Sequence, residues 1–245
     1  MLIIQEGDII MWNRMSLKMR AKQAFRRNYW SAVAVALVMS IITTIFYASG
    51  SNGARGRHSF YGGGYFSESS LIYATVIAAA GVLGVGMVVF DVFVGNVLIA
   101  GGCRFFVLNQ TEPVTAGTLA YGFKSGNYGN IVLIMFLRDL FTALWSLLFI
   151  VPGIIKHYEY LMVPYIIAEN PGMPREEAFL ISNKMMMGQK WEAFVLDLSF
   201  IGWGILTVMT GGIVGVFYAE PYRQATFAEL YSFNRAMAYQ NGYIR

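Results

Sequence analysis

Six ionisable residues interrupt otherwise apolar stretches of this sequence, and they are its first candidates for chemistry. A charged side chain at the centre of a bilayer costs about 2.5–3.5 kcal/mol on insertion scales, so each one needs a partner or a role. Placed along the expected helices, five of the six lie in the inner half of the membrane or at its midplane. The residues are Asp91, Arg138, Asp139, Asp197, Glu220 and Arg223.

We expect these residues to form one polar cluster between four helices, with Arg138–Asp197 and Glu220–Arg223 as pairs. The second pair stands at i,i+3 on one helix face, so it can form without tertiary help. Two interpretations are open. The pairs either fix only the helix register, or the charges line a path for a substrate or a proton.

Catalytic and metal-binding patterns are not found in the sequence. Three serines lie in or near apolar segments without a histidine at a suitable depth, so no nucleophile–base pair is predicted. A single cysteine excludes an intramolecular disulfide and a cysteine metal cluster, and the two histidines lie far apart. We therefore predict no cofactor, no metal and no enzymatic activity. The serines are Ser146, Ser182 and Ser199, the cysteine is Cys103, and the histidines are His58 and His157.

A second polar group, Lys156, His157 and Glu159, is predicted at the outer membrane interface. There it would form an interfacial polar collar, with a proton-handling group as the alternative.

The composition sets the class of protein that must position these side chains. Of the 245 residues, 56% are hydrophobic and only 13% are charged, and the mean hydropathy is +0.51. Soluble domains carry about 25% charged residues, so a soluble enzyme and a disordered chain are both excluded. The net charge of +4 does not indicate nucleic acid, because the basic residues flank apolar segments. Such residues hold a chain end in the cytoplasm and attract anionic lipids.

The hydropathy pattern predicts an all-α, polytopic transmembrane bundle of six spans, residues 29–233, in a bacterial cytoplasmic membrane. Pro152-Gly153 is read as a turn between two spans, with one long kinked helix as the alternative. Six spans place most of the 18 basic residues on the cytoplasmic side together with both termini, whereas five spans weaken this bias. The expected spans are 29–48, 71–100, 130–150, 154–168, 191–209 and 213–233.

Residues 1–28 are predicted to contain an amphipathic helix that lies on the membrane. Basic residues recur every fourth position from Arg14 to Arg26, beside a row of Met11, Met15 and Met19. Met11 and Met15 are also possible translation starts. The first apolar run is longer than a signal-peptide core, which favours an uncleaved anchor, and residues 49–70 read as a flexible external loop.

Residues 169–190 are predicted to form a cytoplasmic surface helix, and residues 234–245 a short tail. Pro174 suits a helix start, and Gly188 suits the position after a helix end. Four small or apolar residues define a narrow buried face, and the run from Met185 to Met187 is expected to pack on the bundle, with a partner-binding patch as the alternative. The face comprises Ala178, Ile181, Ser182 and Met185.

Short motifs from Ala21 to Tyr231, densest in the second half, together form a specific pattern. They include Gly102-Cys103-Arg104-Phe105-Phe106, Leu144-Trp145-Ser146-Leu147-Leu148, Pro152-Gly153-Ile154, Glu169-Asn170-Pro171 and the stretch from Asp197 to Trp203. The pattern resembles the bacterial membrane family called domain of unknown function 975. The resemblance implies an integral protein of the cytoplasmic membrane and carries no activity with it. Glu169, where an Asp is expected, and the charged His157-Tyr158-Glu159 stretch depart from the pattern.

From the sequence we expect a scaffold or accessory protein that binds membrane lipids, another membrane protein or a copy of itself. The alternative is a small transporter or permease component that uses the charges in the inner half of the membrane. No nucleic-acid partner is expected.

Overall fold

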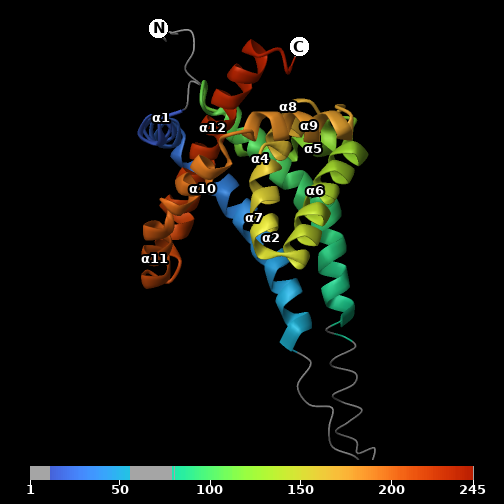
Figure 1. Cartoon of the computed structure of the whole chain (residues 1–245). Coiled ribbons are helices and arrows are strands. Elements are labelled where there is room, and N and C mark those ends of the chain that lie inside the picture. Colours follow the sequence, from blue (N-terminus) through green and yellow to red (C-terminus); the bar gives the residue numbers. More distant parts are fainter. Residues whose placement is uncertain (1–11, 56–78, 80, 245) are drawn as a thin grey trace, which may run out of the picture.

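The computed structural model describes residues 12–55, 79 and 81–244, and for residues 45–55 it describes the backbone alone. Within these residues every regular element is a helix, which confirms the all-α class (Figure 1). Met11 and most of the predicted 49–70 loop lie outside the described residues. The elements up to residue 124 are α1 (Arg14–Arg27), α2 (Tyr29–Arg55), a helical stretch over residues 81–90, η1 (Asp91–Gly95), α4 (Asn96–Leu108), η2 (Ala116–Ala120) and α5 (Tyr121–Lys124). The remainder are α6 (Tyr128–Leu148), α7 (Ile150–Glu159), α8 (Val163–Glu169), α9 (Arg175–Met186), α10 (Lys190–Leu198), α11 (Ile201–Met209), η3 (Gly215–Ala219) and α12 (Glu220–Gln240).

Three helices in the described part of the chain are long and apolar enough to cross a membrane. They are Gly81–Leu108, Tyr128–Leu148 and Lys190–Met209, and Tyr29–Thr44 is a shorter apolar stretch of α2. These helices are compatible with a membrane protein, and they correspond to four of the predicted spans. The predicted total of six spans is not confirmed.

The predicted fourth span, residues 154–168, is not one helix. The structure divides it between α7 and α8, which are separated by a turn at residues 160–162. The chain reverses between two helices, as predicted, but it does so one residue after α6, at the extended residue Phe149 (φ −154°, ψ 138°), and not at Pro152-Gly153. Pro152 instead lies in the first turn of α7, where a backbone N–H has no partner within the helix. With ten residues α7 is about 15 Å long, half of a bilayer core.

The helical hairpin of α6 and α7 is closely packed. A Cβ added to Gly153 would lie 2.6 Å from the Cα of Ser146, so only glycine allows this approach. In Figure 1 the two helices lie side by side, with α8 and α9 across the end to which α7 returns.

This return corrects the position predicted for Lys156, His157 and Glu159. The Glu159 carboxylate accepts hydrogen bonds from Lys156 and from Lys190 at the start of α10, both at 2.7 Å. Its backbone carbonyl accepts one from Ser182 of α9, also at 2.7 Å. The group therefore lies at the same end of the molecule as the surface helix, because the hairpin reverses earlier than the sequence indicates.

The predicted sixth span and tail form one long element with an irregular start. Residues 215–219 are π-helical, and α12 then continues to Gln240, well into the predicted tail. Helix α12 packs against α1, α2, α4 and α9, and its Tyr231 hydroxyl donates to the Glu169 carboxylate of α8 at 2.6 Å. It is thus a central packing helix of the fold.

The two predicted surface helices are present as α1 and α9. In α9 all four residues of the predicted face are buried, and so is Met186, whereas Met187 is exposed. Gly188 follows the end of the helix, as predicted, and has φ +75°. Helix α1 packs through another face than its methionine row, since Met15 and Met19 are 70% and 55% exposed. Its buried residues are Leu17, Ala21, Ala24 and Phe25.

Candidate functional site

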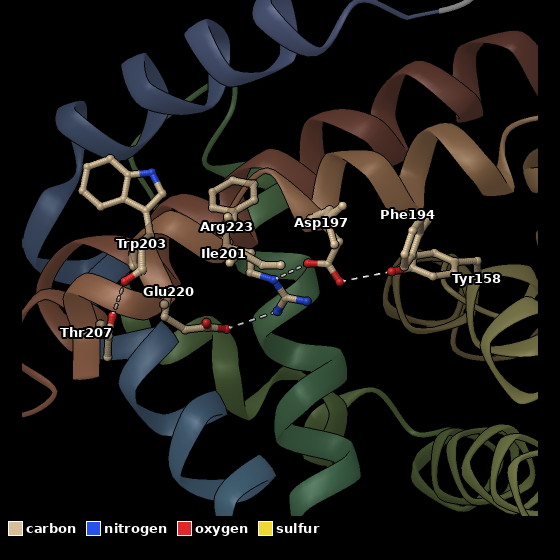
Figure 2. Close-up of a pocket in the computed structure, with 13 residues that line it drawn as sticks. Tyr158, Phe194, Asp197, Ile201, Trp203, Thr207, Glu220 and Arg223 are labelled. Atoms are coloured by element: carbon tan, nitrogen blue, oxygen red, sulfur yellow. Dashed lines mark hydrogen bonds and ion pairs between the residues drawn. The ribbon is translucent and has the colours of Figure 1, made fainter. Parts of the chain in front are cut away.

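An open groove of about 500 Å³ lies between the α10–α11 segment and the start of α12 (Figure 2). Most of its lining is apolar or aromatic, and its three charged residues, Asp197, Glu220 and Arg223, form one linked group, which we call the charged wall. The apolar and small lining residues are Phe194, Leu198, Phe200, Ile201, Trp203, Gly204, Gly215 and Ala219. The polar ones are Tyr158, Asp197, Thr207, Glu220 and Arg223.

Arg223 is at the centre of the charged wall. Its Nε donates to Asp197 Oδ1 at 2.8 Å, and its Nη1 lies 3.7 Å from Glu220 Oε1. The Tyr158 hydroxyl donates to the second Asp197 oxygen at 3.2 Å. Figure 2 shows the guanidinium between the two carboxylates, with Tyr158 beyond Asp197. The wall therefore joins α7, α10 and α12 and carries two carboxylates for one guanidinium.

The irregular backbone before α12 places Glu220 in this wall. The Glu220 N–H bonds to the carbonyl of Gly215, five residues back, which is the π-helical pattern. The next residue, Pro221, has no N–H for the carbonyl of Phe217 four residues before it. That carbonyl accepts instead from the Tyr29 hydroxyl of α2 at 3.0 Å. A long-range hydrogen bond thus compensates for the proline and anchors the turn that presents Glu220.

The apolar end of the groove is formed by the α11–η3 hairpin. Its turn depends on Gly211 and Gly212, with φ of +60° and +95°, a region that glycine adopts without strain. A Cβ on Gly215 would overlap Thr207, whereas one on Gly204 would meet no atom within 4 Å. The hairpin is therefore closed at Gly215 and open at Gly204.

The rim of the groove is contacted by α1. Lys18 Nζ donates to the Ser199 hydroxyl at 2.6 Å and lies 4.5 Å from the centroid of the Phe200 ring, where α10 gives way to α11. Burial, and then the nearby Arg14, lower the pKa of Lys18 below its usual range. The amphipathic helix therefore holds a cation over a lining residue of the groove.

The predicted cluster of six charges forms two groups. Arg138 pairs with its neighbour Asp139, Nε to Oδ1 at 2.9 Å, and the buried Asp91 lies within electrostatic range of both. The predicted Arg138–Asp197 pair is wrong, because each residue is paired elsewhere. The predicted Glu220–Arg223 contact is present at 3.7 Å.

Two residues of the wall were not predicted. Tyr158 lies inside the polar stretch 156–159, for which the sequence predicted an interfacial polar collar or a proton-handling group formed by its neighbours. Gln224 donates through Nε2 to Glu220 Oε1 at 2.8 Å, and its spacing of i+4 on the same helix could have identified it.

The three candidate serines donate their hydroxyl protons to helix carbonyls. Ser146 bonds to Thr142 and Ser182 to Glu159, each through the backbone oxygen, and Ser199 bonds to that of Leu196. Among the described residues, no group of three His, Cys, Asp or Glu side chains could hold a metal ion. The arrangement is suited to binding through charge and apolar contact.

Apolar helices around a lateral groove are features compatible with a membrane protein. The family model described as "Protein of unknown function (DUF975)" matches residues 149–236, so over this stretch the chain is similar to that family. This confirms the resemblance seen in the motifs of the second half. The match extends from α7 into α12 and includes every residue that lines the groove. No curated protein and no solved structure matches the chain.

Proposed function

We propose that this chain is a multi-pass protein of the bacterial cytoplasmic membrane that binds lipid in the groove and serves as a scaffold or accessory protein. The observation that carries the proposal is the shape and lining of the groove, an apolar trough that contains one charged wall. A phospholipid has the same division into an apolar chain and a charged head. Both termini and the surface helix α9 are assigned to the cytoplasmic side, in line with the positive-inside rule.

The surface around the groove supports this proposal. Helix α11 has no buried residue, and Ile205, Val208 and Met209 are 58%, 81% and 77% exposed. Apolar surface of this kind is costly in water and is favourable against lipid chains. A lipid could thus enter the groove sideways from the membrane.

A role without catalysis is supported by the hydrogen bonds of the serine hydroxyls. Each candidate nucleophile donates its proton to a helix carbonyl, so a general base would have to break that bond first. The charges of the wall are also engaged with one another, as expected of a binding surface.

Filling the groove tests the proposal. Gly204→Leu places a side chain in the open space of the trough, and Gly202→Leu is the matched control on α11, because it does not line the groove and its Cβ also meets no atom within 4 Å. We expect lipid that co-purifies with the chain in mild detergent, counted by mass spectrometry, to fall about tenfold in the first variant alone. Equal lipid content in the two variants would contradict lipid binding in the groove.

A transporter is the second candidate, and one observation favours it. Each of the two π-helical turns adjoins an acid, since Asp91 begins η1 and Glu220 follows η3. Such turns are frequent at functional sites. Asp139→Asn and Asp197→Asn separate the candidates: a transporter should lose solute or proton flux in proteoliposomes with its fold intact. A scaffold should lose thermal stability and retain its bound partner.

A further inference from the structure

The charged wall of the groove has unused hydrogen-bonding capacity. The Arg223–Glu220 contact of 3.7 Å is too long for a hydrogen bond. Within the described residues, Arg223 Nη2 and Glu220 Oε2 have no hydrogen-bond partner, and the two side chains are 35% and 30% exposed. A guanidinium donor and a carboxylate acceptor thus lie next to each other on the wall of the groove.

A zwitterionic headgroup complements this arrangement. A phosphate can accept from the free guanidinium nitrogen, and an ammonium group can donate to the free carboxylate oxygen, both as charge-assisted hydrogen bonds. The loose ion pair gives way at little cost, because each partner exchanges one ionic contact for another.

The charge of the wall selects among headgroups. Asp197, Glu220 and Arg223 together carry one excess negative charge, which disfavours a headgroup that brings a phosphate without a cation. The contact with Glu220 requires an N–H donor, which ethanolamine has and the fully methylated choline group lacks.

The apolar part of the groove starts directly beside this wall. Ala219 precedes Glu220 in the chain, and the trough continues along Gly215, Thr207 and Gly204. The open space at Gly204 leaves room for an acyl chain next to a headgroup held by Arg223 and Glu220.

We propose that the groove binds a phospholipid with an ethanolamine headgroup, with the phosphate on Arg223, the ammonium on Glu220 and an acyl chain along the α11–η3 trough. This inference rests on the proposed lipid-binding function and names the lipid.

Competition between headgroups provides the test. The full chain in detergent is mixed with phosphatidylethanolamine, phosphatidylcholine and phosphatidylglycerol of identical acyl chains, and bound lipid is counted by native mass spectrometry. We expect the ethanolamine lipid to bind about tenfold more tightly than the other two, the effect of one charge-assisted hydrogen bond. Glu220→Gln should abolish this preference, while Glu177→Gln, an exposed carboxylate on α9 outside the groove, should retain it.

The outcomes distinguish this inference from the function on which it rests. Suppose that Gly204→Leu loses its lipid, while the unaltered chain binds the three lipids equally or prefers the glycerol lipid. This result overturns the ethanolamine inference and leaves lipid binding in the groove in place. Unchanged lipid binding in Gly204→Leu overturns both. If Glu220→Gln does not fold, the headgroup series on the unaltered chain and on Gly204→Leu still decides.

Discussion

The chain forms two helical hairpins of opposite character. In the α6–α7 hairpin the helices touch, with Gly153 against Ser146, and Arg138 is neutralised by the adjacent Asp139. In the segment from α10 to α12 the helices touch at Gly215 and Thr207 but leave an open groove at Gly204, and Arg223 is neutralised by Asp197, 26 residues away on another helix.

The difference shows how the two hairpins use their charges. A pair between neighbours in sequence needs no tertiary contact and leaves the helices free to pack closely. A pair across helices instead fixes how two elements, here α10 and α12, lie relative to each other. Glu159 connects the two regions, because it ends α7 and binds Lys190 at the base of α10.

Loss of the Glu159 carboxylate should release both hairpins. Its side chain is 8% exposed, so Glu159→Gln leaves Lys156 and Lys190 without their shared counter-ion. Breaking a buried pair costs about 3–5 kcal/mol, and we expect the lower end because the lysines can turn towards solvent. Thermal unfolding in detergent measures this, with Glu177→Gln as the exposed control. Similar losses of stability in the two variants would show that Glu159 does not connect the hairpins.

Replacing a glycine by leucine should destabilise the α6–α7 hairpin but not the groove. Gly153→Leu forces a Cβ to within 2.6 Å of the Ser146 backbone, and we expect it to destabilise the protein by about 1–3 kcal/mol, as overpacking does. Gly204→Leu, directed into the groove, should leave the melting temperature nearly unchanged. Equal losses of stability in the two variants would show that protein atoms already occupy the space next to Gly204.

Double-mutant cycles should separate the cross-helix pair from the pair predicted by sequence. Alanine at Asp197 and Arg223 should give a coupling of about 1 kcal/mol, modest because both side chains are partly exposed to solvent. Alanine at Arg138 and Asp197 should give losses that add within about 0.5 kcal/mol. Unfolding measured for the single and double variants provides both values, and strong coupling in the second cycle would restore the predicted pair.

Local patterns in the sequence were sufficient for several features. The four residues predicted for the buried face of α9 are all buried, since three- and four-residue spacing fixes a helix face without any knowledge of its neighbours. The Glu220–Arg223 contact and the Thr210-Gly211-Gly212 turn follow in the same way from i,i+3 geometry and from glycine's tolerance of positive φ.

The errors concern contacts between distant segments. Arg138 was assigned to Asp197 because both lie about two helical turns in from the cytoplasmic ends of their predicted spans. In the structure the long guanidinium side chain turns back to Asp139 and leaves Asp197 to Arg223. The predicted position of the reversal between α6 and α7 was wrong, because hydropathy records the length of an apolar run and does not show that the chain reverses at Phe149.

The sequence by itself determined an all-helical chain, its apolar segments and its surface helices, because these follow from periodicity, composition and local charge. Only the tertiary structure decided that Tyr158, Asp197, Glu220 and Arg223 meet at one wall and that the α11–η3 trough stays open beside it. The physical reason is that a helix face specifies what it must bury or pair, while the partner is chosen by how the helices pack.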